Sequence, residues 1–297
     1  MNAKKTNRIA TGVIYFLVGI VVLLLVGILG NILVSGLPHL SWHFLSSESS
    51  SFEAGGGIRD QLFNSIYLLL LTLLISMPIA LGAAIYLAEY APDNWFTQLI
   101  RTTIEILSSL PSIVVGLFGY LLFVVQFGFG FSILAGALAL TFFNLPTLTS
   151  NIEEAIKGVP QTQREAGWAL GLSNWKTIHG IVLPAALPGI ITGVILSAGR
   201  VFGEAAALIY TAGQSGSTVD YSNWNMFSPT SFLNVMRPAE TLAVHIWKVN
   251  TEGIIPDVNV VSAGTSALLV IVVIIFNFGA RALGNWIYKR LTAARIK

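Results

Sequence analysis

Long apolar segments, separated by short polar connections, are the dominant pattern along this chain. A helix that crosses a bilayer needs about 20 mainly apolar residues. Six segments meet this requirement, and we expect each to form a membrane-spanning helix. They are residues 10–34, 62–88, 104–125, 130–147, 185–210 and 263–287. Asn144 and Pro146 interrupt the fourth segment, which indicates that its helix ends there.

The composition agrees with this pattern. Hydrophobic residues make up 54% of the 297 residues and charged residues only 10%, whereas soluble domains carry about 25% charged residues. We therefore expect an all-α polytopic membrane protein. The first apolar run, 9–34, is too long for the core of a signal peptide and is expected to be a retained anchor. The net charge of +2, with clustered basic residues, does not favour nucleic-acid binding, and the absence of cysteine excludes disulfides and thiolate metal sites.

If all six segments span the membrane, lysine and arginine are distributed unequally between the connections on its two sides. Twelve lie on the side that holds both termini and residues 148–184, and three lie on the other side, with Arg200 left within a span. Because basic residues favour the cytoplasmic side, we expect both termini in the cytoplasm and the loops 35–61 and 211–262 outside. The first outer loop is rich in Ser, Glu and Gly and is expected to be flexible. The aromatic residues of the second loop indicate a structured cap, in which residues 238–249 fit a short amphipathic helix.

A polar stretch rich in small residues, 164–184, lies between very apolar segments. Pro160 suits the first turn of a helix, and Gly171 suits the left-handed turn that follows one. A second short helix is expected over 174–181, with Pro184 starting the next span. We expect this helix–glycine–helix element to dock another protein. An ordinary amphipathic hairpin at the membrane surface is the alternative.

Two opposite charges, Arg200 and Glu204, lie within the fifth apolar segment. Charges in mid-membrane cost about 2.5–3.5 kcal/mol each on insertion scales and commonly mark a substrate pathway. At a spacing of four residues they share one helix face. We interpret them as an anion gate, in which Arg200 pairs with Glu204 in the empty pathway and meets the anion in the loaded one. A self-neutralising structural pair is the alternative. Ser197 and Gly203 would permit close packing and backbone contact along the same pathway.

Several kinds of active site lack the residues that they need. The chain contains no Gly-Lys dipeptide, so it has no phosphate-binding loop of the Gly-Lys-Ser/Thr type, and ATP-derived energy would have to come from another subunit. His39 and His43 have the spacing of metal ligands but no acidic partner at a useful distance along the chain. Because the four histidines supply no nucleophile–base set, we expect no catalytic residue, no metal site and no cofactor on this chain.

Seven residues of the polar stretch have the spacing of a known signature, Glu-Ala-Ala followed by Gly and an Ile-x-Leu-Pro ending. They are Glu165, Ala166, Gly167, Gly171, Ile181, Leu183 and Pro184. This pattern resembles the cytoplasmic signature of binding-protein-dependent ABC importer permeases. Gly167 in place of the second alanine is the one departure, and it keeps the surface small. In that family the element inserts into a groove of the ATPase subunit, so the resemblance implies the same coupling role here.

Four further runs, 83–91, 110–118, 153–161 and 198–208, are similar to runs in permeases of phosphate-specific ABC importers of the PstA type. The likeness covers about residues 60–290. Ala205 and Ala207 stand where that family has Thr and Pro, which leaves both charges in place. The resemblance implies a six-helix type I importer permease fold (MetI-like). Residues 1–60 would hold the N-terminal tail, first helix and outer loop, and residues 61–290 the permease core, with a coupling element at 151–184 and an outer loop at 211–262.

The resemblance also implies a function and partners. The chain would be the membrane subunit of an ATP-driven importer of inorganic phosphate in the bacterial cytoplasmic (inner) membrane. Its partners would be a homologous second permease (PstC type), two ATPase subunits (PstB type) that hold ATP and Mg, and an external phosphate-binding protein (PstS type). An importer of another oxyanion, such as molybdate or sulfate, would keep the coupling signature without the Arg200–Glu204 run. An ATP-independent channel is the alternative from a different class.

Overall fold

The computed structural model describes residues 3–50, 53–215, 219–253 and 255–293. Within these residues the regular structure is helical, apart from one isolated bridge between Asp220 and Ser231. In chain order the helices are α1 (Ala3–Gly36), α2 (Trp42–Ser46), α3 (Arg59–Ile85), α4 (Trp95–Ser108), α5 (Ser112–Gly119), α6 (Ile133–Lys157), α7 (Gln161–Ala169), α8 (Asn174–Thr177), α9 (Leu183–Phe202), α10 (Ala206–Thr211), α11 (Leu242–Glu252) and α12 (Val258–Ala293). A 3-10 turn, η1 (Leu37–His39), and three π-helical segments, η2 (Tyr86–Tyr90), η3 (Tyr120–Gln126) and η4 (Ile178–Val182), extend or join them. The expected all-α class is confirmed.

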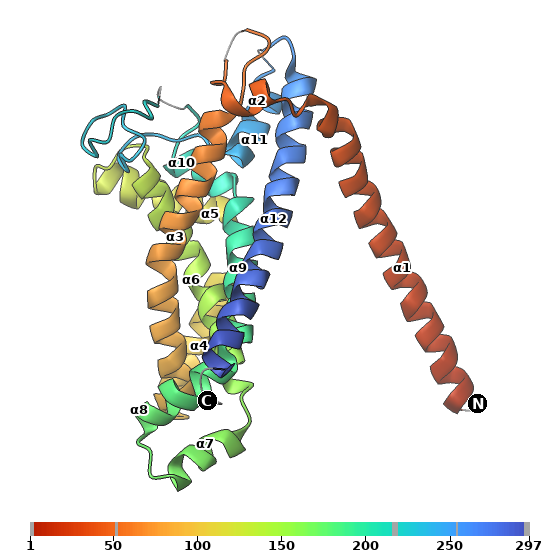
Figure 1. Ribbon diagram of the computed structural model, residues 1–297, viewed down its shortest axis with the longest axis vertical. Coiled ribbons are helices and arrows are strands. Elements are labelled where there is room, and N and C mark those ends of the chain that lie inside the picture. The colour runs from red at the N-terminus through yellow and green to blue at the C-terminus, as the bar shows by residue number, and fades with distance from the viewer. Residues whose placement is uncertain (1–2, 51–52, 216–218, 254, 294–297) are drawn as a thin grey trace.

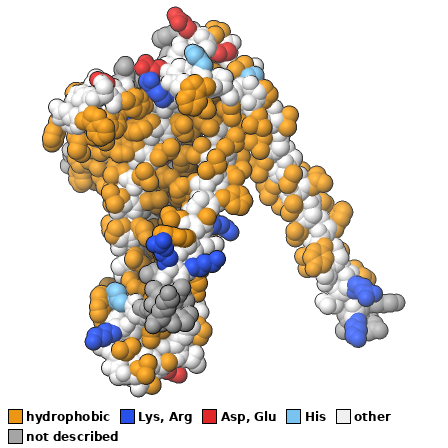
Figure 2. Space-filling view, viewed as in Figure 1, with side chains coloured by type: hydrophobic (Ala, Val, Ile, Leu, Met, Phe, Trp, Pro, Cys, Tyr) orange, Lys and Arg blue, Asp and Glu red, His pale blue; other side chains and the backbone are white. Residues whose placement is uncertain are grey.

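Six membrane spans fit the described helices. Five helices are long and apolar enough to cross a membrane, and the bent pair α4–α5 makes a sixth if it counts as one span. Figure 1 shows α3, α6, α9 and α12 running together as a bundle, while α1 leans away from it. Apolar side chains cover the visible middle of the bundle and most of α1 (Figure 2), as expected for a surface that faces lipid.

The molecule has two polar ends. At one end, called the α7 end below, lie α7, the start of α1 and the end of α12 (Figure 1). At the other, the loop end, lie the described parts of segments 37–58 and 212–257. On the visible face most Lys and Arg side chains lie toward the α7 end and most Asp and Glu side chains toward the loop end (Figure 2). This agrees with a cytoplasmic α7 end, although that orientation stays a prediction.

Near the α7 end, α3 and α6 pack through a dense apolar cluster. Ala80 and Ala84 of α3 contribute to it, together with Leu148, Ile152 and Ile156 of α6, all of them fully buried. The three α6 residues recur every four positions and therefore line one face of the helix. Two small residues opposite three large ones let the two helix backbones approach closely.

The expected end of the fourth span at residue 147 is wrong, because α6 continues through Pro146 to Lys157. Proline removes one backbone hydrogen bond and would ordinarily end or kink a helix. Here the residues that follow form the fully buried face just described, and burial of a Leu or Ile side chain contributes about 1.5–3 kcal/mol. Tertiary packing thus outweighs the local signal.

The third expected span, 104–125, is not one straight helix. Its first residues belong to α4, and α4 and α5 are bent by 97° at the intervening break. Pro111 explains the break, because proline disfavours helical backbone in the residue before it and itself adopts extended backbone here, with ψ of 135°.

The first outer loop was expected to be flexible, but its described residues are folded. Phe44 of α2 is buried, and Ile58, just before α3, is fully buried. The backbone N–H of Ile58 donates to the Phe44 carbonyl at 2.9 Å, and that of Gly57 donates to the Glu48 carbonyl at 2.7 Å. The Ser- and Gly-rich composition allows these tight turns, so it reflects loop geometry rather than disorder. The amphipathic helix expected at 238–249 is confirmed as α11, shifted by a few residues.

Replacement of Gly36 by leucine is expected to weaken the packing of α1 on α12. A Cβ at position 36 would lie 2.2 Å from the Ala263 carbonyl oxygen, so the two helices would have to separate. Overpacking of this kind costs about 1–3 kcal/mol, and thermal unfolding of the purified protein in detergent measures the loss. Gly27→Leu is the matched control, because a Cβ there meets nothing within 4 Å. Equal stability of the two variants would contradict the prediction.

Candidate functional site

The polar stretch 164–184 folds as a helix, a left-handed glycine turn and a second helix. Gly171 has a φ of +75°, a conformation that residues with a Cβ rarely adopt. The Gly171 N–H donates to the Trp168 carbonyl at 2.9 Å, and the Leu172 N–H donates to the Gly167 carbonyl at 3.1 Å. These bonds satisfy carbonyls at the end of α7, as the sequence predicted for Gly171.

The second helix differs from the expectation of a separate segment over 174–181. The chain remains helical from Asn174 to Phe202, through α8, η4 and α9. Pro184 therefore lies in the first turn of α9 without interrupting the helix. The π-helical segment η4 directly precedes it, and such a widened turn accommodates a residue that has no N–H to donate. The polar stretch is thus physically continuous with the fifth span.

The seven signature residues divide into an exposed and an internal group. Glu165, Ala166 and Gly171 are exposed. Gly167 is buried, and a Cβ there would lie 2.7 Å from Thr177 Cγ2 and 3.0 Å from Ile181 Cδ1. Leu183 packs against the apolar cluster of α3 and α6, and Ile181 and Pro184 are half-buried.

The exposed group has large apolar neighbours that the sequence pattern did not single out. Leu170 is 79% exposed, Trp175 60% and Trp168 45%. Two tryptophans and a leucine left accessible near small residues in the sequence suit contact with another protein, since aromatic anchors dominate such interfaces. The name "docking face" is used below for Glu165, Ala166, Trp168, Leu170 and Trp175.

Arg164, which the sequence suggested only as a basic residue of the inner side, is buried. Its guanidinium binds the Glu89 carboxylate through Nε (3.1 and 3.3 Å) and Nη2 (2.7 Å). Nη1 donates to the Val159 carbonyl at 2.6 Å, and Nη2 to the Ile156 carbonyl at 2.9 Å. Arg164 therefore joins α7 to η2 at the end of α3 and to the end of α6.

The expected pairing of Arg200 with Glu204 on one helix face is wrong. Helix α9 ends at Phe202, and Gly203 to Ala205 connect it to α10. Glu204 instead accepts a hydrogen bond from the Ala207 backbone N–H at 3.1 Å, so its carboxylate caps the start of α10. The favourable position of an anion at a helix N-terminus explains this choice.

Arg200 contacts α6 instead. Nη1 donates to Thr147 Oγ1 at 3.0 Å, and the guanidinium carbon lies 3.9 Å from the centre of the Phe143 ring. The residue is half-buried, and within the described part of the chain no carboxylate forms an ion pair with it. A cation stacked on an aromatic face is stabilised but not neutralised.

Ser197 of the expected pathway set lies one turn before Arg200 and is buried. Its Oγ donates to Asn144 Oδ1 at 2.9 Å, while the buried Asn144 Nδ2 has no hydrogen-bond partner among the described residues. Gly203, the fourth residue of the set, is exposed at the end of α9. Asn144, interpreted from the sequence as a helix end, is thus a polar contact between α6 and α9 close to Arg200.

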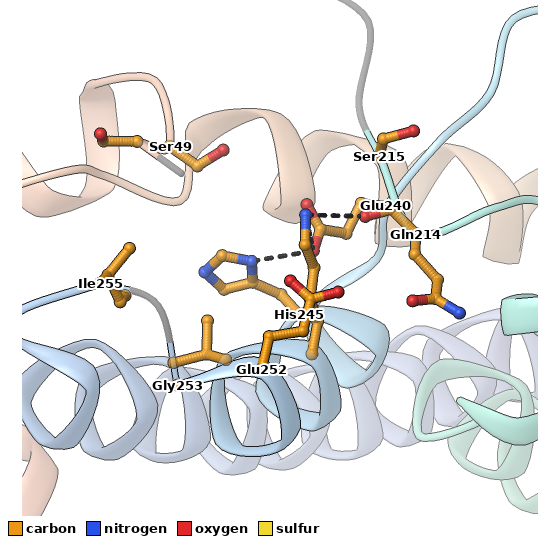
Figure 3. Close-up of a pocket in the computed structure, with 11 residues that line it drawn as sticks. Ser49, Gln214, Ser215, Glu240, His245, Glu252, Gly253 and Ile255 are labelled. Carbon is orange, nitrogen blue, oxygen red and sulfur yellow. Dashed lines mark hydrogen bonds and ion pairs between the residues drawn. The ribbon is translucent and has the colours of Figure 1, made fainter. Parts of the chain in front are cut away.

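A third polar cluster, which the sequence did not indicate, lies at the loop end. Glu240 is 2% exposed, accepts a hydrogen bond from Gln61 Nε2 at 3.0 Å, and lies 3.1 Å from His245 Nδ1 and 3.8 Å from Lys248 Nζ. Glu240, His245 and Lys248 border a cavity of about 330 Å³ beside α11 (Figure 3). Nearby, Arg237 donates to Asn64 Oδ1 at 2.7 Å, and burial lowers the pKa of Arg237.

Comparison with known proteins gives a consistent result. Residues 76–293 match the family model described as binding-protein-dependent transport system inner membrane component. The chain is 53% identical over 293 residues to YqgI of Bacillus subtilis, a probable ABC transporter permease protein, and the match covers 99% of this chain and 100% of that protein. It is 36% identical over 233 residues to PstA, a phosphate transport system permease protein of Haemophilus influenzae, covering 78% of this chain and 81% of that one.

A solved structure of an inward-facing MetNI methionine ABC transporter is similar in fold. Its TM-score is 0.55 at 18% identity, and the match covers 79% of this chain and 94% of that one. The likeness confirms the expected MetI-like architecture.

Replacement of Gly167 by alanine, the residue that the signature carries there, is expected to destabilise this particular chain. The added methyl would collide with Thr177, whose β-branched side chain is stiff. The collision costs about 1–3 kcal/mol, against a gain of about 1 kcal/mol in helix propensity. We expect a net loss of about 1 kcal/mol in thermal unfolding, largely restored by adding Thr177→Ala.

Gly180→Ala, in the adjacent η4, is the control, since a Cβ there meets nothing within 4 Å. A stabilising Gly167→Ala would show that α7 and α8 do not pack as described.

Proposed function

The chain belongs to the family of binding-protein-dependent transport system inner membrane components and is a permease subunit of an ABC importer, and from this premise we propose that its cargo is inorganic phosphate. The observation that carries the proposal is Arg200, a half-buried guanidinium at the end of a membrane span with no carboxylate partner in the described residues. An uncompensated cation there favours an anionic cargo. The guanidinium fork matches two phosphate oxygens at once. The similarity to a phosphate transport permease supports the same cargo.

The surroundings of Arg200 suggest how an anion would be received. Thr147 and the Phe143 ring hold the guanidinium in place. Because both partners are neutral, Arg200 can leave them for an anion without separating an ion pair. Glu204 is occupied as the cap of α10, so the gate proposed here uses Arg200 with Thr147 and Phe143, and Glu204 shapes the path by holding α10.

The docking face would receive the ATPase subunit. Two ATPase subunits holding ATP and Mg would lie at the α7 end, which would be cytoplasmic, and both chain termini would lie on that side. A homologous second permease would complete the pathway, and an external phosphate-binding protein would deliver the anion to the loop end. ATP binding would displace α7, and the unbroken helix from Asn174 to Phe202 would carry that displacement to Arg200.

Arg200→Gln is expected to reduce phosphate uptake by membranes that contain the whole complex. Loss of charge-assisted hydrogen bonds of about 1.5–3 kcal/mol corresponds to a decrease of about tenfold to a hundredfold. Radiolabelled phosphate uptake, with sulfate and molybdate as competitors, measures the loss and the specificity. Arg290→Gln is the matched control, because Arg290 also lies over an aromatic ring, Trp286 at 4.0 Å, but on α12. Undiminished uptake by Arg200→Gln would reject the gate, and competition by sulfate equal to that by phosphate would favour a general oxyanion importer.

Ala166→Trp is expected to prevent ATPase binding without unfolding the permease. Ala166 is exposed on the docking face, so the large side chain would obstruct a closely fitting partner and leave the interior unchanged. Co-purification of the ATPase subunit with the permease measures the effect. Ala54→Trp is the control, an exposed alanine at the loop end. Normal co-purification and normal ATP-driven uptake by Ala166→Trp would contradict docking at this face. Uptake by the unaltered chain without ATPase subunits or ATP would instead favour an ATP-independent channel.

A further inference from the structure

The most completely bonded charged pair of the described chain is Arg164 with Glu89, and neither residue belongs to the docking face. The side chains are 10% and 9% exposed. Three short distances join the guanidinium to the carboxylate, and its two remaining contacts are backbone carbonyls. A guanidinium that uses its planar fork in this way fixes both the distance and the orientation of the elements that it joins.

The pair joins three elements at one point. Arg164 comes from α7 and Glu89 from η2 at the end of α3. The Ile156 carbonyl belongs to the last turn of α6, and the Val159 carbonyl lies just after that helix. The carbonyls at a helix C-terminus carry partial negative charge, so a cation is favourable there. Helices α3 and α6 are themselves locked together by the fully buried cluster described above. A displacement of α7 would therefore be transmitted to α3 and α6 as one unit.

The contact of α7 with the fifth span is of a different kind. Gly167 packs against the side chains of Thr177 and Ile181. The buried Thr177 Oγ1 has no hydrogen-bond partner among the described residues, so this contact contains no directional bond. Two connections thus lead away from α7: a charged one to α3 and α6, and a packed one to the helix that bears Arg200. If only the packed connection remained, α7 could slide on the bundle.

Stability alone does not account for the pair. A buried ion pair is often no more stabilising than apolar residues of the same volume, because both charges lose their hydration. What it does provide is a fixed geometry. Building on the proposed coupling function, we propose that Arg164 and Glu89 are positioning residues that make α3 and α6 move with α7, so that ATP hydrolysis is converted into transport instead of into movement of α7 alone.

A distance measurement tests the proposal directly. The chain contains no cysteine, so Gln163→Cys and Asp93→Cys, both exposed, place spin labels on α7 and just beyond η2. The labelled chain is reconstituted with its second permease, ATPase subunits and binding protein. We expect the label-to-label distance to stay the same with and without ATP plus vanadate in the otherwise unaltered chain, and to shift or broaden with ATP in Glu89→Gln. A nucleotide-dependent distance in the unaltered chain would overturn the proposal.

A coupling measurement tests its consequence. In Glu89→Gln we expect solute transported per ATP hydrolysed to fall at least about fivefold, the lower end of coupling energies between sites, with ATPase co-purification retained. The ratio for Arg164→Lys should lie between those of Glu89→Gln and the unaltered chain, because lysine keeps the charge but cannot form the fork. Arg101→Gln is the control. It breaks a 3.0 Å bond to Glu153 and a 2.9 Å bond to the Leu87 carbonyl, which join α4 to α6 and to η2, and it leaves α7 untouched.

The outcomes separate this inference from the proposed function. If the unaltered chain binds no ATPase, or drives no uptake of any anion, the proposed function fails. If it transports normally and Glu89→Gln and Arg164→Lys keep its transport-to-ATP ratio, the inference fails. If Glu89→Gln does not assemble with the ATPase subunits, two other measurements test the inference. They are the transport-to-ATP ratio of Arg164→Lys and the label-to-label distance in the otherwise unaltered chain.

Discussion

The lack of water in the hydrocarbon core governs how this chain arranges its polar groups. A backbone or side-chain polar group without a partner there costs several kcal/mol. Each interruption of a span is therefore accompanied by a substitute bond. Where α9 ends, the Gly203 N–H still donates to the Gly199 carbonyl, and the Glu204 carboxylate accepts from the Ala207 N–H. The same requirement explains why Glu204 does not pair with Arg200: the N–H of the buried Ala207, at the start of α10, needs an acceptor and lies nearer along the chain.

Buried polar groups find partners of different kinds at the two ends and in the middle of the bundle. At the α7 end, the Arg164–Glu89 pair joins three helices through charge. In the middle of the bundle, single neutral bonds such as Ser197 to Asn144 connect α6 with α9. At the loop end, Glu240 collects an amide, an imidazole and an ammonium group in one buried network. Strong, directional contacts thus hold the two ends, and weaker neutral ones lie between, where a transporter must rearrange.

The sequence predicted those features that depend on local chemistry. Apolar length predicted the spans, and the glycine turn at Gly171 followed from its place after a helix-forming run. Predictions failed where packing overrode a local signal: Pro146 and Pro184 both lie inside continuous helices, because buried faces or a π-helical turn compensate for the missing N–H. Arg164 and Glu89 are 75 positions apart, and no spacing rule joins residues so distant. A spacing of four residues likewise does not show whether a helix ends between the two residues. Between Arg200 and Glu204 it does, because α9 ends at Phe202.

The helix that is continuous from Asn174 to Phe202 connects the polar stretch 164–184 directly to Arg200. At 1.5 Å per residue, 29 helical residues span roughly 43 Å, about the thickness of a bilayer with its headgroups. A hinge at Pro184 would have absorbed a displacement of α7 before it reached Arg200. Without that hinge, a small tilt at the α8 end would become a lateral movement at the other end, where the Arg200 guanidinium contacts two neutral partners, Thr147 and Phe143. In the proposed cycle, the weakness of those two contacts would make Arg200 responsive, because a paired Arg200 would have to be separated from a carboxylate each time.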